Sequence, residues 1–166
     1  MRQVMDAQMK FGEVDISEIT FKTRSTDEMV KVLKGLQHIY MNKETRTKLF
    51  DYLERLSPED TRTDTGRPGM NMWKVFVLAM VRLAKNSDIN GLLDLADNHM
   101  RMRAMMGHTR DDDTTYDEET IRRNMQLFTP EIIDEINKII VDAGHKIVVK
   151  KNSKMNMRHW WSSKQR

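Results

Sequence analysis

The chain has 166 residues, no cysteine, and 28 basic against 25 acidic side chains. This length accommodates one ordinary domain, or one domain with short appendages. The lack of cysteine excludes a disulfide framework and thiolate metal sites, and fits a cytoplasmic protein. Charges interrupt the N-terminus too often for a signal peptide, and the longest apolar run, Val75 to Val81, is too short to span a bilayer. We therefore expect no membrane segment.

The basic side chains are distributed unevenly. From Gly144 to the end there are seven lysines and arginines and no acid, which leaves 21 basic against 25 acidic side chains in the remainder. Such a tail attracts polyanions over about a Debye length. The alternative is a solvated end without a partner.

The first half of the chain predicts a pair of helices after a weakly patterned segment. Residues 1–25 are polar, and the stretch DISEITF fits a short strand or a turn. Residues 26–57 predict two amphipathic helices, capped by Thr26 and by Asn42, with the second ending before Ser57-Pro58. Residues 58–70 are rich in turn formers and read as a loop or linker.

The second half, residues 71–149, predicts a further group of helices. Asn71 caps a helix that is apolar nearly all round, so we expect it at the centre of the fold. A helix starting at Ser87 or Asp88 and a short one from Met100 to Met106, closed by Gly107, follow. Two more are predicted: one from Thr115 or Asp117 to Phe128, and one opening at Thr129-Pro130-Glu131.

Strand alternation between hairpin turns is missing from the sequence. The predicted fold is therefore all-α: a compact multi-helix bundle with a helix-turn-helix-like element and a basic tail over residues 150–166. The helices at 88–98 and 117–128 are the candidate helix-turn-helix. Arg122, Arg123 and Asn124 on the later helix are of the types that reach phosphates or base edges. A solvated polar face on a bundle helix is the alternative.

Enzymatic chemistry has little support in the motifs. Three consecutive acids, Asp111 to Asp113, point in divergent directions on a loop and favour a solvated loop over a magnesium site. The five histidines lack zinc spacing, and no nucleophile elbow or glycine-rich phosphate loop occurs. We expect no metal and no cofactor. The methionines around 100–106 suit core filling or an interaction surface, and Trp160-Trp161 suit base stacking or docking onto the body.

Several short stretches resemble one family when they are taken together. These are LQHIYMNKETRTKLF, GRPGMNMWKVFVLAMVRL, LLDLADNHMRMRAMMGH and YDEETIRRNMQLFTPEIIDEINKIIVDAGHKIV. In this order and spacing they resemble the N-terminal region of bacterial insertion-sequence transposases of the DDE type, of the ISNCY-like kind. The resemblance spans roughly residues 30–150 of the printed sequence.

The resemblance implies a helical domain that binds the terminal inverted repeats of the element and assists assembly. In the family, a catalytic domain follows that uses two metal ions. Here the sequence departs from the family pattern near Asn152 and no acid follows Asp142, so we expect a truncated transposase without the catalytic acids.

The leading interpretation is a DNA-binding and assembly module without catalysis. Beyond Arg122, Arg123 and Asn124, the predicted phosphate contacts are cations in the linker, the middle helices and the tail: Arg62, Arg67, Arg101, Arg103, Lys150 and Lys151. The alternative is a helical protein-interaction module that oligomerises with itself or inhibits a full-length transposase. The methionine-rich stretch and the apolar helix at 72–83 motivate that alternative.

Overall fold

The computed structural model describes residues 3–6, 8–22, 24, 27–56 and 69–142. It divides into two units, one reaching Thr129 and one beginning at Pro130, which we describe separately. Within the described residues the secondary structure is helical, and the β-contacts amount to one isolated bridge between Glu13 and Thr109. The predicted all-α class is confirmed. No helix in the described part of the chain is long and apolar enough to cross a membrane.

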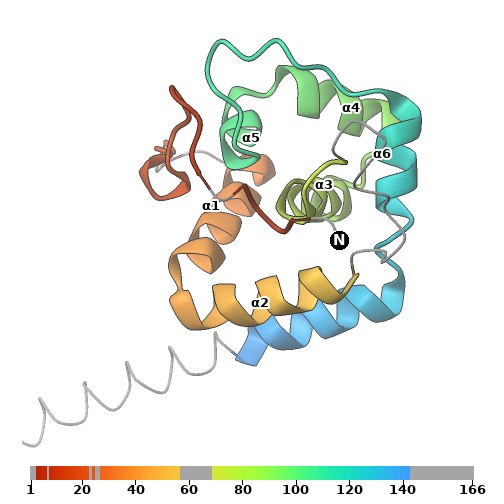
Figure 1. Cartoon of the computed structure of the whole chain (residues 1–166). Helices are drawn as coiled ribbons and strands as arrows, with labels where there is room; N and C mark the ends of the chain where they lie inside the picture. Colours follow the sequence, from red (N-terminus) through yellow and green to blue (C-terminus); the bar gives the residue numbers. More distant parts are fainter. Residues whose placement is uncertain (1–2, 7, 23, 25–26, 57–68, 143–166) are drawn as a thin grey trace, which may run out of the picture. The chain divides into compact units, whose positions relative to one another are not determined.

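The first unit is arranged around helix α3, Met72–Lys85. It packs against α1 (Glu28–Met41), α2 (Lys43–Leu56), α4 (Ile89–Asn98), α5 (Met100–Met105) and α6 (Glu118–Met125), as Figure 1 shows. Val75, Phe76 and Leu78 are fully buried, and they point in different directions around the helix. The prediction of a central helix, based on its all-round apolar sequence, is therefore confirmed.

Trp73 is the hub of this packing. Its ring lies 5.5 Å from Tyr40 of α1, 5.8 Å from Phe50 of α2 and 5.6 Å from Phe76, centroid to centroid. The indole N–H donates to the Met105 carbonyl across 2.8 Å, so its one polar atom is satisfied in the core.

Local sequence signals set most helix starts. Asn42, Asn71, Asp88 and Asp117 each accept a hydrogen bond from a backbone N–H of the first turn. Thr26 lies outside the described residues, and Asp27 caps α1. The helix predicted to reach Phe128 ends at Met125, where Leu127 and Phe128 continue in a turn through backbone bonds to Asn124 and Met125.

The weakly patterned N-terminal segment is bound to the helices. The carbonyls of Gln3 and Val4 accept from the first N–H groups of α3. DISEITF forms a short 3₁₀ turn, η1 (Ile16–Glu18), and the Gln37 amide on α1 donates to the Ile16 carbonyl across 2.8 Å. Tertiary hydrogen bonds, together with the buried side chains of Ile16 and Ile19, therefore fix this segment.

In the second unit the described residues, 130–142, form one helix. It begins at Pro130, as the Thr129-Pro130-Glu131 start predicts. The predicted basic tail and its tryptophan pair lie outside the described residues.

Candidate functional site

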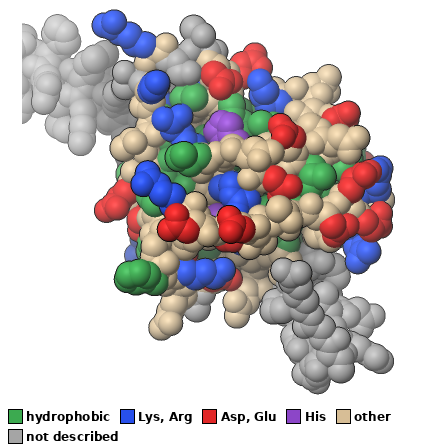
Figure 2. Space-filling view, turned by 90° about the horizontal axis from the view of Figure 1, so that it is seen from above, with side chains coloured by type: hydrophobic (Ala, Val, Ile, Leu, Met, Phe, Trp, Pro, Cys, Tyr) green, Lys and Arg blue, Asp and Glu red, His purple; other side chains and the backbone are tan. Residues whose placement is uncertain are grey.

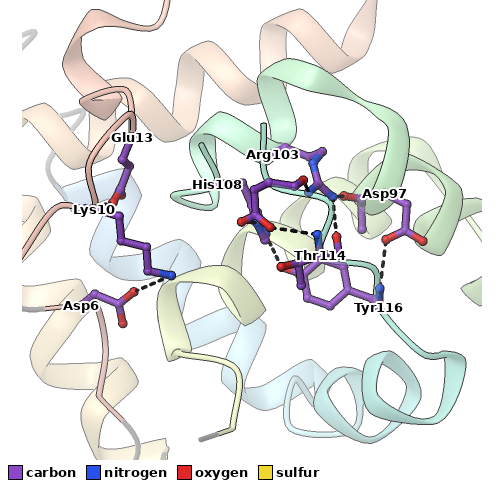
Figure 3. Close-up of polar contacts among 10 residues, drawn as sticks. Asp6, Lys10, Glu13, Asp97, Arg103, His108, Thr114 and Tyr116 are labelled. Atoms are coloured by element: carbon purple, nitrogen blue, oxygen red, sulfur yellow. Dashed lines mark hydrogen bonds and ion pairs between the residues drawn. The ribbon is translucent and has the colours of Figure 1, made fainter. Parts of the chain in front are cut away.

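A polar network closes the loop between α5 and α6, with His108 at its centre (Figure 3). His108 Nδ1 lies 2.6 Å from the Asp112 carboxylate, and Nε2 lies 2.5 Å from the Tyr116 hydroxyl. The imidazole is almost fully buried, so both of its nitrogens need partners. The pattern is satisfied by a neutral imidazole that donates from Nδ1 and accepts at Nε2.

Arg103 of α5 binds the same loop from the other side. Its guanidinium donates to the carbonyls of Ala96 at 3.2 Å, Thr114 at 3.0 Å and Asp112. The backbone N–H of Tyr116 donates to Asp97 on α4 across 3.0 Å. The network therefore ties the end of α4, α5 and the approach to α6 together.

Burial and hydrogen bonding set the protonation states of the network. Burial lowers the pKa of His108, and the nearby charges of Lys74 and Arg103 also lower it, while Asp112 opposes them. Burial acts to raise the pKa of Asp112, but hydrogen bonds from Thr114 and His108 outweigh it and hold that pKa well below its usual value. Burial raises the pKa of Tyr116.

The order Asp112–His108–Tyr116 has the connectivity of a carboxylate–histidine–hydroxyl relay. A raised pKa, however, keeps the Tyr116 hydroxyl protonated, and a protonated phenol is a poor nucleophile. The arrangement is better suited to holding the loop than to generating a reactive oxygen.

A polar hollow of about 620 Å³ opens beside this network. The N-terminal segment, the start of α3, the α5–α6 loop and α6 all contribute to its wall. Its cationic side chains are Lys10, Lys74 and Arg123. Burial lowers the pKa of Lys74, and the positive charge of Lys10 lowers it further.

The arginines predicted on the last helix of this unit lie on the outer face of α6. Arg122 pairs with Glu118, and Arg123 lies 3.8 Å from Glu119, each one helical turn away. The Arg123 side chain is 70% exposed. Both arginines are therefore accessible to a partner.

The other described members of the predicted set have intramolecular roles. Asn124 is buried, and its amide donates to the Thr120 carbonyl across 2.8 Å, so in the structure it is not exposed for the predicted contact with phosphates or base edges. The Arg103 guanidinium is engaged by backbone carbonyls, and Arg101 Nε donates to the Thr20 carbonyl across 3.0 Å. The predicted contacts Arg62, Arg67, Lys150 and Lys151 lie outside the described residues.

The charge pattern of the described surface is mixed. On the face seen in Figure 2, lysines and arginines are interspersed with carboxylates. Of the three consecutive acids, Asp112 faces His108, whereas Asp111 and Asp113 are exposed. Within the described ranges, no group of three His, Cys, Asp or Glu side chains is arranged to hold a metal ion.

Of the residues of the hollow, sequence reasoning singled out Arg123 and Asn124 as contacts, but not Lys10, Lys74 or His108. Lys74 carried a signal, since it is the lone cation early in an otherwise apolar helix. His108, Asp112 and Tyr116 are four residues apart, a spacing that suggests one face of a helix, but they meet through a loop instead. Lys10 carried no signal, because tertiary contacts fix its segment.

Comparisons of the chain with protein-family models, with curated proteins and with solved structures yield no match. The resemblance to insertion-sequence transposases therefore stays a prediction from the sequence.

Proposed function

We propose that the chain is a DNA-binding and assembly module of a transposase, without catalytic activity of its own. The observation that supports this most is the two-sided build of α6. Ile121 and Met125 are buried, while Arg122 and Arg123 are exposed side by side on the opposite face. Phosphate contacts of this kind position a helix on a duplex.

The present partners of these arginines do not prevent a phosphate contact. Exposed ion pairs one helical turn apart contribute at most about 0.5 kcal/mol. A phosphate therefore displaces Glu118 or Glu119 at small cost. Glu118 and Glu119 at the start of α6 repel the phosphates of DNA, which disfavours deep insertion of that end into a groove. The proposed contact of α6 is therefore with the phosphate backbone of the duplex.

The test is a mobility-shift titration of the full chain on a duplex carrying the terminal inverted repeats of the element, beginning at about 50 mM salt. We expect Arg122→Gln/Arg123→Gln to weaken binding and to lower the slope of log affinity against log salt by about two. The matched control is Lys48→Gln/Arg55→Gln, two cations on the exposed side of α2. No binding at low salt, or equal binding to a scrambled duplex, refutes specific recognition.

The alternative, a protein-interaction module, is supported by fewer residues than the sequence suggested. Met102, Met105 and Met106 are buried, and only Met100 of that stretch is exposed, at 68%. Phe11 is fully exposed on a turn and adds a second apolar contact point. Light scattering tests this alternative: a parent chain that is monomeric at all concentrations argues against self-association, and an oligomer whose molar mass Phe11→Ser leaves unchanged argues against Phe11 as its contact.

A further inference from the structure

We infer that the hollow between the N-terminal segment, α3 and α6 binds a phosphate group through Lys10, Lys74 and Arg123. The inference takes a phosphate as its ligand on the chemistry of the wall alone. Naming the DNA backbone as the source of that phosphate rests on the proposed function.

The hollow is large enough for such a group. Its volume of about 620 Å³ is far larger than the space that a single water molecule needs, roughly 30 Å³. A phosphodiester with part of its hydration shell fits this space. The exposed side chains of Lys10 and Arg123 are free to adjust to a ligand, and the partly buried Lys74 is held on the rigid central helix.

Two acidic side chains of the wall, Asp112 and Asp117, are already engaged as hydrogen-bond acceptors, and a third, Asp6, lies 3.9 Å from Lys10. Asp112 accepts from His108 and from the Thr114 backbone. Asp117 caps α6, where it accepts from the Glu119 backbone across 3.0 Å and from the Thr120 hydroxyl. These carboxylates therefore serve the fold, and they offer few remaining acceptor sites to the cations of the hollow.

The cations, in contrast, have donors to spare. Among the described residues, no hydrogen bond or ion pair joins the Lys74 ammonium to an acceptor. Lys10 lies 3.9 Å from Asp6, and Arg123 lies 3.8 Å from Glu119, both beyond hydrogen-bond distance. Lys10 and Lys74 also repel each other, while the carboxylates of Asp6, Asp112 and Glu13 attract Lys74. A dianion or a phosphodiester supplies the acceptors and relieves that repulsion.

A second hollow, of about 590 Å³, provides a contrast, because two of its arginines already donate hydrogen bonds to backbone carbonyls. It is lined by Arg101 and Arg103, but these donate to the carbonyls of Thr20 and Thr114. Arg101 and Arg103 therefore act as internal braces, which leaves Arg110 as the remaining arginine in the lining of the second hollow. The first hollow is lined by three cations, Lys10, Lys74 and Arg123, and is the better phosphate site.

The first arm of the test uses inorganic phosphate and the full chain. In a titration followed by amide NMR, we expect shifts at Lys74 and at residues 114–120, and about tenfold weaker binding in Lys74→Gln. Lys85→Gln is the matched control, because it lies on the same helix with a side chain 34% exposed. Unchanged phosphate binding in Lys74→Gln, or shifts confined to other regions, overturns the inference.

The second arm uses duplex DNA. Loss of a phosphate contact weakens binding to all sequences and lowers the salt slope by about one. We expect this from Lys74→Gln but not from Lys85→Gln. Because Lys74 is partly buried, Lys10→Gln in the N-terminal segment is a second variant that leaves the core untouched, and each variant is first checked for a cooperative unfolding transition.

The two arms separate failure of the site from failure of the function. Phosphate binding that depends on Lys74, with no duplex binding by the parent chain, keeps the site and refutes the proposed function. Duplex binding by the parent chain that neither Lys74→Gln nor Lys10→Gln alters keeps the function and rules out the DNA backbone as the source of the phosphate. Unchanged binding of inorganic phosphate in Lys74→Gln refutes the site itself.

Discussion

The first unit contains two buried regions that are stabilised in opposite ways. Around Trp73, apolar rings from three helices pack together and a single hydrogen bond satisfies the indole. Around His108, the buried ring depends on a carboxylate and a phenol, and it lies beside a hollow lined with charges. The stability of the hub depends mainly on how well its rings pack. The stability of the network depends on pH, and ligand binding by the cations of its hollow is expected to depend on salt concentration.

The difference indicates a division of labour within one unit. Apolar packing at the hub holds α1, α2, α3 and α5 together at any protonation state. The polar network fixes where the loop ends and α6 begins, and thus where Arg122 and Arg123 are presented. Variants at Trp73, at His108 and at the arginines of α6 separate these two contributions to stability.

The largest effect is expected at the hub. Trp73→Ala removes a fully buried ring and leaves the Met105 carbonyl without its donor, which together cost about 3–5 kcal/mol of unfolding free energy. Since a domain of this kind has only about 5–15 kcal/mol, the urea midpoint falls steeply. Trp73→Phe keeps most of the packing and is expected to lose roughly half as much. Equal losses for the two variants contradict the packing account.

Local signals in the sequence predicted the hub region well. Caps at Asn71 and Asp88 need only the residues of one helical turn, and the all-round apolar character of α3 marks it as central. The spacing of the apolar residues in α6 also indicated that Asn124 is buried. It lies three residues after Ile121 and next to Met125, on the buried face, so its polar type was a misleading guide to exposure.

The polar network around His108 could not be predicted from local sequence signals of this kind. Its contacts join a loop to two helices through side chains whose partners lie on other elements or across a turn. The loop has no repeating pattern, and the position of a histidine within it does not indicate burial. Lys10 illustrates the same limit, since it reaches the hollow only because Gln3 and Val4 bind the start of α3.

A middle-sized effect is expected from pH at His108. Its pKa in the folded chain lies below the unfolded value of about 6.5. Between these two values the unfolded chain binds more protons, so stability is fully present above about pH 6.5 and is lost as pH falls through the folded pKa. Urea unfolding at pH values from 8 to 5 measures this loss. Each unit of difference between the folded and the unfolded pKa corresponds to a loss of about 1.4 kcal/mol of unfolding free energy.

The control for this pH dependence is His108→Gln, which cannot titrate. Its baseline stability is lower because Asp112 and Tyr116 lose their partner, but its slope between pH 8 and 5 is expected to be shallower than in the parent chain. Burial also lowers the pKa of His99, so His99→Asn identifies the share of the slope that belongs to that residue. An unchanged slope in His108→Gln refutes the role assigned to the network.

The smallest effect on stability is expected at the arginines of α6. Arg122→Gln/Arg123→Gln removes two exposed ion pairs and is expected to change the unfolding free energy by less than about 0.5–1 kcal/mol. Arg103→Gln is the contrasting variant. It leaves backbone carbonyls of the loop without charged donors and is expected to cost about 1–3 kcal/mol. If the Arg122 and Arg123 variant loses as much unfolding free energy as the Arg103 variant, the two arginines of α6 stabilise the fold. The proposal that they are available to a partner is then contradicted.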